Sequence, residues 1–151
     1  MKRRVNDYCP GYVPYVVHLI AVDDREHRQS GARFGGKRVQ AFFFRSEAGR
    51  EPVREWLRSL PSRDDRKRIG EDIKTVEFGW PVGMPVCRAL RGGLYEVRSH
   101  LTQNRIARVL FYFDKHGRMV LLHGFIKKTP KTPVEDLELA MRNKKKHERS
   151  Q

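Results

Sequence analysis

The sequence has few of the residues that build metal sites or disulfide frameworks. Two cysteines, Cys9 and Cys87, lie far apart and outside any metal-ligand spacing. We interpret them as free thiols of a reducing compartment, and nothing in the sequence requires a disulfide between them. Histidines and carboxylates form no cluster with the spacing of metal ligands, so we predict neither a metal ion nor another cofactor.

Long hydrophobic runs are also absent from the N-terminal part of the chain. The apolar stretch from Val13 to Val22 contains Pro14 and His18 and is far shorter than the roughly 20 residues that a membrane span requires. It follows a basic N-terminus, as a signal peptide would, but it lacks a small-x-small cleavage site and runs into the charged residues 23–26. We therefore expect a cytoplasmic protein that does not enter a membrane.

Acidic residues are outnumbered by basic ones. The chain has 32 Lys and Arg against 18 Asp and Glu, a formal net charge of +14. Such an excess predicts attraction to a polyanion, and nucleic acid is the first candidate. A ribosomal or merely basic soluble protein is the alternative on charge alone. The 151 residues are enough for one domain with a sizeable core.

The first half of the predicted domain contains one strand and two helices. Val39 to Arg45 is aromatic and bounded by polar residues, which predicts a buried strand. One helix is expected to begin at Pro52 and a second at Ser62, an N-cap residue. Their apolar faces are formed by Val53, Trp56, Leu57 and Leu60 and by Ile69, Ile73 and Val76. The outer face of the second helix carries Arg63, Arg66, Lys67, Arg68 and Lys74. We interpret it as a solvated basic face, with a phosphate-tracking surface as the alternative.

Three strands and a helix are expected in the second half. Residues 79–85 are predicted to form a loop, and the strands are Gly93 to Ser99, Arg105 to Asp114 and Arg118 to Lys127. Thr132, with Pro133 and Glu135, predicts the start of the last helix. The order of elements is typical of an α+β domain, a small, twisted, mainly antiparallel sheet with the two N-terminal helices on one face and a C-terminal helix. We divide the chain into an N-terminal extension (1–37), a domain (38–142) and a basic, frayed tail (143–151).

Side chains alternate between the two faces of a sheet, so each residue of a predicted strand can be assigned to one face or the other. The face expected to meet the helices is apolar and contains Val109, Phe111, Phe113, Val120, Leu122 and Ile126. The opposite face would gather Glu96, Arg98, Arg108, Tyr112, His123 and Lys127, interleaved with Leu94, Leu110, Leu121 and Phe125. Its cations outnumber its single acid, whereas an ordinary solvated face mixes both signs. We interpret it as an RNA-binding face, with a solvated face or a protein-binding face as alternatives.

The same face could cleave RNA, because RNA carries its own nucleophile, the 2′-hydroxyl. Cleavage then needs a base, cations for the developing phosphorane charge and an acid for the leaving oxygen, and it needs no metal. Arg98 and Arg108 could clamp the scissile phosphate. Lys127 or Lys128 could be the base, while His123 is either an alternative base or acid or a structural residue. Candidates for RNA binding are Tyr112, Phe125, Arg91 and Arg105.

Three segments of the second half form a set of motifs in a fixed order: Leu90 to Arg98 (LRGGLYEVR), Arg108 to Phe113 (RVLFYF) and Val120 to Pro133 (VLLHGFIKKTPKTP). Together they resemble the signatures of the phage-derived HigB-type toxins of the RelE superfamily. The resemblance covers about residues 39–142. It implies a RelE-like fold, entry into the ribosomal A site and cleavage of the mRNA there. Carried over by position, it points to Arg98, Arg108, Lys127 and Lys128, together with Tyr112 and His123.

The resemblance also implies a partner. Such toxins are neutralised by a small antitoxin, usually with a helix-turn-helix domain, and the pair contacts operator DNA through that antitoxin. The chain departs from the family in its N-terminal extension and in Pro130, where the family commonly has Gln.

Two other functions compete with this interpretation. One is a non-catalytic RNA- or ribosome-binding protein of the same fold. The other is a DNA-binding regulator, which is disfavoured because the sequence has no helix-turn-helix pattern.

Overall fold

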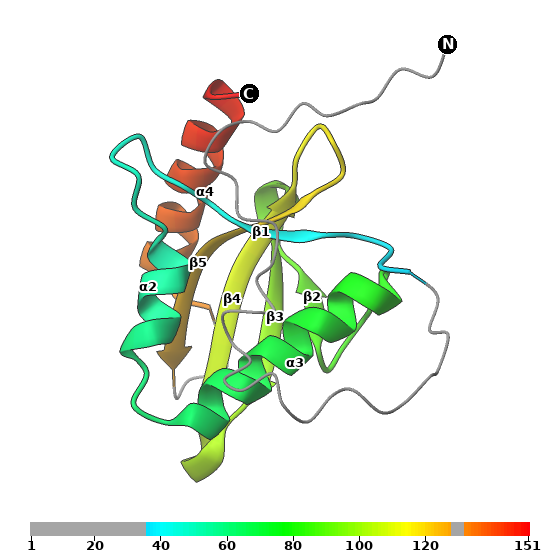
Figure 1. The fold of residues 1–151 in the computed structure, drawn as a ribbon, viewed down its shortest axis with the longest axis vertical. Helices are drawn as coiled ribbons and strands as arrows, with labels where there is room; N and C mark the ends of the chain where they lie inside the picture. Colours follow the sequence, from blue (N-terminus) through cyan, green and yellow to red (C-terminus); the bar gives the residue numbers. More distant parts are fainter. Residues whose placement is uncertain (1–35, 128–131) are drawn as a thin grey trace.

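The computed structural model describes residues 36–127 and 132–151, so Cys9 and the predicted extension up to residue 35 lie outside the described part. In it, the chain forms one sheet with strand order β1-β5-β4-β3-β2 (Figure 1). The strands are β1 (Ala41–Phe43), β2 (Cys87–Ala89), β3 (Tyr95–His100), β4 (Ile106–Phe113) and β5 (Met119–Lys127). Strand β1 runs parallel to β5, and the other neighbouring pairs are antiparallel. The predicted α+β class and the mainly antiparallel sheet are therefore confirmed.

Helices cover both faces of this sheet (Figure 1). Helices α2 (Pro52–Ser59) and α3 (Arg63–Gly79) pack on one face, over a core that includes Ile73, Val109 and Phe111. Helix α4 (Val134–Arg149) packs on the other face, over a second core that includes Leu94 and Leu110. The two N-terminal helices therefore share one face as predicted, whereas the last helix, which the sequence did not place, covers part of the face that we had interpreted as RNA-binding. Most apolar residues of that second face are buried by α4 and do not meet solvent.

A β-bulge in β5 overturns part of the predicted division of faces. Leu110 pairs with His123 but the next residue, Phe111, pairs with Leu121, so Leu122 is the extra residue. The period-two alternation is interrupted there, and every residue on one side of the bulge changes face relative to the simple pattern. Leu121 therefore lies in the core under α2 and α3, whereas Val120 and Leu122 lie under α4. The sequence prediction had placed these three residues on the opposite faces.

The C-terminal residues are part of the fold and not a frayed tail. Helix α4 continues to Arg149, and Asn143 and His147 are both buried. Asn143 Nδ2 donates to the carbonyl of Leu122 at 2.9 Å, which ties the helix to the bulged strand. The basic composition of this segment suggested a solvated tail, but its two uncharged polar residues lie one turn apart and face the sheet. Short strand β2 was also not predicted, since Pro85 and two glycines precede it.

Strand β5 and helix α2 pack closely at Gly124. A Cβ atom at this position would lie 2.3 Å from the Trp56 ring. We expect Gly124→Ala to lower the free energy of unfolding by about 1–3 kcal/mol, because the rigid indole must move out of a packed core. Urea unfolding of this variant measures the effect, with Gly83→Ala as the control, because a Cβ at Gly83 would have no other atom within 4 Å apart from its chain neighbours and its φ is not positive. Equal stability of Gly124→Ala and the unmodified chain would contradict the packing described here.

Candidate functional site

Beyond the N-terminal end of α4, the sheet face carries a group of polar and aromatic residues from three strands. We call it the cationic face and define it by Glu96, Arg98, Arg108, His123, Phe125 and Lys127. Strand register brings its members together. Arg98 on β3 pairs with Arg108 on β4, and Arg108 pairs with Phe125 on β5. Sheet geometry therefore places these residues side by side, as the sequence predicted for this face.

Arg108 occupies the centre of the cationic face and is fully buried. Its guanidinium lies 3.6 Å from the Glu96 carboxylate, which is also 0% exposed. The Thr132 hydroxyl connects the two: it accepts from Arg108 at 2.6 Å and donates to Glu96 at 2.7 Å. Burial lowers the pKa of Arg108, with a smaller opposing effect from Glu96 and a further lowering from Arg98 and Arg88. In this arrangement Arg108 cannot clamp a phosphate directly, contrary to the role predicted from the sequence.

Arg98 is the neighbouring cation and it reaches solvent. Its side chain is 15% exposed, and its Nε lies 3.8 Å from Glu96 Oε1. Its Nη1 contacts Met84 Sδ at 3.8 Å, and Met84 is one of the exposed apolar residues. Glu96 thus faces two arginines, one buried and one at the surface. Because the buried Arg108 already balances the carboxylate, Arg98 keeps positive charge for an anion from solvent.

His123 is held in a defined orientation by contacts on both sides. Its Nε2 lies 2.7 Å from Asp136 Oδ1, an acid in the first turn of α4. Its ring stacks on Phe125, with centroids 5.4 Å apart and planes 20° from parallel. A carboxylate on one ring nitrogen fixes the tautomer and leaves Nδ1 as the nitrogen to exchange a proton with a ligand. His123 and Phe125 are both partly exposed, so an RNA base could reach them.

The remaining predicted residues are distributed over several places. Lys127, at the end of β5, is partly exposed and pairs with Ile106 at the edge of the cationic face, and Lys128 lies outside the described residues. Arg105 lies near the N-terminus of α3, where its Nη2 contacts Asp65 at 2.7 Å. Arg91 is exposed next to α4, away from the cationic face.

Tyr112 is buried and cannot stack on an RNA base in this structure. It is 3% exposed, because α4 covers it. Its hydroxyl lies 2.6 Å from His147 Nδ1, and the Lys144 ammonium lies over its ring. The RNA-binding role predicted for Tyr112 is therefore corrected to a contact that docks the last helix.

Comparison with known protein families gives a match. Residues 55–145, more than half of the chain, match the family described as phage derived protein Gp49-like (DUF891). This chain belongs to the Gp49-like family. The family is part of the RelE/HigB-like toxin superfamily, which agrees with the broader resemblance found in the sequence. No curated protein matches the chain.

The stretch shared with the Gp49-like family contains the whole cationic face, together with Thr132 and Asp136. Sequence reasoning missed the roles of these last two residues. Thr132 was predicted to cap α4, but the helix begins after Pro133 and the hydroxyl binds Arg108 and Glu96 instead. Asp136 is thirteen residues from His123 and on another element, so no local pattern signals the contact. Only the three-dimensional return of α4 over the sheet brings them together.

The described residues contain neither a cluster of metal ligands nor a helix suited to a membrane. Within residues 36–127 and 132–151, no group of three or more His, Cys, Asp or Glu residues is placed to hold a metal ion. In the same part of the chain, no helix combines the length and apolar character needed to cross a membrane. Cys87 is a buried free thiol, and burial raises its pKa to about 11, which makes it a poor nucleophile.

The docking of α4 through His147 is expected to depend on pH. Burial, followed by the effect of Arg118, lowers the pKa of His147 from its ordinary value of 6.5, against opposing effects of Asp114 and Glu148. The unfolded chain therefore takes up a proton near pH 6.5 that the folded chain does not take up until lower pH. This contribution to stability is complete above that pH and is lost as pH falls through the window below it.

Urea unfolding of wild type and His147→Gln between about pH 7.5 and about pH 5 tests this dependence. Glutamine can still accept from Tyr112 but takes up no proton in this range. We expect the wild type to lose more stability on acidification than the variant. Identical losses in both proteins would contradict a contribution from His147.

Proposed function

We propose that this Gp49-like protein is the toxin of a toxin-antitoxin system and that its cationic face cleaves messenger RNA. Membership of a RelE/HigB-like toxin superfamily supports the toxin assignment and predicts an antitoxin partner. The single observation that carries the nuclease assignment is the cationic face itself. It places an oriented histidine, a stacked aromatic ring and a surface arginine on one side of the sheet. The finer proposals are a RelE-like fold, cleavage in the ribosomal A site, and a helix-turn-helix antitoxin that contacts operator DNA.

The proposed reaction uses the chain's own side chains. A base removes the proton of the 2′-hydroxyl, whose oxygen attacks the neighbouring phosphorus while the bond to the 5′-oxygen breaks. The leaving oxygen takes a proton from an acid, so a cyclic phosphate and a 5′-hydroxyl result. His123 through Nδ1 and Lys127 are the candidates for the two proton transfers, and Phe125 offers a ring for a base to stack on. Arg98 would stabilise the charge that develops on the phosphorane.

Arg108 has a different part in this proposal. Because it is buried against Glu96 and Thr132, it acts as a positioning residue that holds Glu96 and so orients Arg98. The burial of Arg108 also favours a second candidate function, a non-catalytic protein that binds RNA or the ribosome through the same surface. The two functions differ in one observable, which is whether the message is cut.

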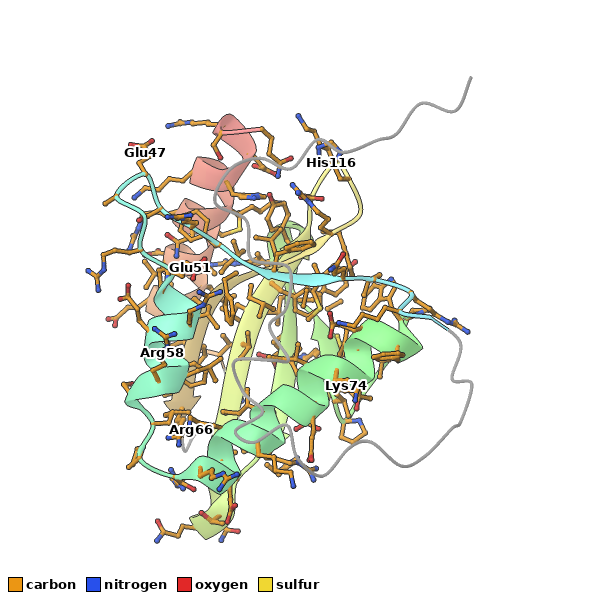
Figure 2. The ribbon with its side chains drawn as sticks, in the orientation of Figure 1. Glu47, Glu51, Arg58, Arg66, Lys74 and His116 are labelled. Carbon is orange, nitrogen blue, oxygen red and sulfur yellow. The ribbon has the colours of Figure 1, made fainter. Side chains whose placement is uncertain are left out.

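The test is to induce three proteins in bacteria and map mRNA 5′ ends by primer extension. The proteins are the wild type, Arg98→Gln/Lys127→Gln and a control, Arg58→Gln/Lys74→Gln, whose residues lie on α2 and α3 (Figure 2). Both variants lose one arginine and one lysine. We expect new cuts inside translated codons with the wild type and the control, and at least about a hundredfold fewer with the first variant. Thermal melting of the purified proteins checks that all three are folded.

Intact message with the wild type would overturn the nuclease proposal and leave the non-catalytic function. Equal cutting by the wild type and Arg98→Gln/Lys127→Gln would retain a nuclease but remove its chemistry from the cationic face. Cutting of purified RNA without ribosomes would overturn the proposed action in the A site.

A further inference from the structure

A second cationic surface lies between the turn that precedes β3 and helix α4. The short 3-10 turn Arg91–Gly93 and one side of α4 enclose an open groove of about 250 Å³. We call it the α4 groove. Its lining residues are Arg91, Glu138, Met141, Arg142 and Lys145. The four helical residues are spaced i, i+3, i+4 and i+7, so they form one stripe that faces the turn.

The groove depends on a close approach of the turn to the helix. Gly92 and Gly93 both have positive φ values, 70° and 71°, which other residues rarely adopt. A Cβ at Gly92 would lie 2.9 Å from the Met141 methyl group, and a Cβ at Gly93 would lie 3.3 Å from Lys144 Nζ. Lys144 instead donates to the carbonyl of Gly92 at 2.8 Å. The paired glycines therefore fix Arg91 opposite the basic stripe of α4.

Within the described residues, the basic side chains of the α4 groove form no ion pairs that would stabilise the fold. Elsewhere, arginines such as Arg54, Arg105 and Arg118 are paired with carboxylates at 2.6–2.8 Å. In the part of the chain that the structure describes, Arg91, Arg142 and Lys145 have no carboxylate within ion-pair distance. Like charges gathered on one helix face and across a turn repel each other, which costs stability. Glu138 is the one acid in the lining and leaves an excess of positive charge.

We infer that the α4 groove binds the phosphodiester backbone of the same RNA strand that the cationic face cleaves. This inference rests on the proposed function for the identity of the ligand. Two exposed guanidinium groups and an ammonium suit phosphate oxygens, and an open groove suits a backbone more than an enclosed small molecule. The turn ends at Leu94, which packs in the core under α4, and leads directly into β3, where Arg98 belongs to the cationic face. At roughly 3.3 Å per residue, Arg98 lies about 13 Å along the chain from Leu94, so a strand of a few nucleotides that passes the turn next to the groove can also reach Arg98.

Binding of a non-cleavable RNA separates this inference from the nuclease proposal. A 2′-O-methyl oligonucleotide of about ten residues lacks the nucleophile but keeps the backbone, and its length is comparable to known single-strand sites. Its affinity is measured against salt for the wild type, Arg142→Gln/Lys145→Gln and the control Arg58→Gln/Lys74→Gln (Figure 2). Each double variant removes one arginine and one lysine from exposed helix surfaces. A dinucleotide of the same chemistry serves as a ligand too short to span both surfaces.

We expect the groove variant to bind the long oligonucleotide at least about tenfold more weakly, with a salt slope reduced by about 1.4 for two lost phosphate contacts. The control variant should lose much less, and the dinucleotide should not distinguish the proteins. Equal losses in both double variants would overturn the inference, because net charge alone would then explain binding. Unchanged affinity of the groove variant would overturn it as well. Cleavage of unmodified RNA is scored separately, so a wild type that binds through the groove but never cuts would refute only the nuclease.

Discussion

Replacing Glu96 with alanine is expected to lower the free energy of unfolding by about 3–5 kcal/mol, one of the largest losses for a single substitution in this chain. The Arg108 guanidinium is 0% exposed, and the substitution removes the carboxylate that lies 3.6 Å from it. A buried positive charge is then left without its partner. The substitution also removes the acceptor of the Thr132 hydroxyl, which connects the sheet to the start of α4. Urea or thermal unfolding measures the loss. A change below about 1 kcal/mol would show that the pair contributes little.

A double variant separates the charge of this pair from its shape. In Glu96→Leu/Arg108→Met, both charges are replaced by apolar groups of roughly similar size, so no buried charge is left unpaired. Such replacements of buried ion pairs are often neutral or stabilising. We therefore expect the double variant to recover most of the stability lost by Glu96→Ala. It should still fail to cleave RNA, because Arg98 loses the carboxylate that orients it. Recovery of stability without loss of cleavage would show that the pair is structural only.

Local sequence patterns predicted the parts of the fold that depend on local chemistry. Pro52 at the start of α2 and the Ser62 cap of α3 act through backbone groups a few residues away, and both were predicted. The β5 bulge was not predictable, because it depends on pairing with β4 and not on the residues of β5 alone. The same reason applies to α4. Thr132, Pro133 and Glu135 predicted a helix at this point of the chain, but which sheet face the helix covers is decided by the long-range packing of the whole chain.

The candidate site shows the same division. Alternation within β3 and β4 placed Arg98 and Arg108 on one face, and strand pairing confirmed their juxtaposition. The alternation does not predict how deeply each side chain is buried. Arg98 and Arg108 share one face, yet the Arg98 side chain reaches solvent and the Arg108 side chain is fully buried. Tyr112 was misjudged for this reason, because α4 covers one end of the face and leaves the other accessible. Asp136, the partner of His123, lies on that same helix. The position of α4 over the sheet was not predicted, and this one omission explains both the error about Tyr112 and the missing partner of His123.

Substitution of His123 with alanine is expected to lower the rate of RNA cleavage by about a hundredfold to ten-thousandfold, the range for loss of a general acid or base. Replacing its partner, Asp136→Asn, should lower kcat by at least about tenfold with little change in KM, because the ring loses its fixed orientation while the RNA contacts remain. Glu135→Gln is the matched control, since Glu135 is an acid in the same first turn of α4. Both substitutions remove one negative charge near the helix N-terminus and should cost similar stability.

The tautomer of the His123 ring is a measurement that would stay the same if Asp136 had only a structural role. With Asp136 accepting from Nε2, the neutral ring carries its proton on Nε2, and nitrogen NMR reports that tautomer. In Asp136→Asn the amide can also donate, so a mixture of tautomers should appear and should accompany the fall in kcat. The Glu135→Gln protein should keep both the wild-type tautomer and the wild-type rate. A slow Asp136→Asn enzyme with an unchanged tautomer would remove Asp136 as a positioning residue, whereas an unchanged rate in His123→Ala would remove the histidine from the chemistry altogether.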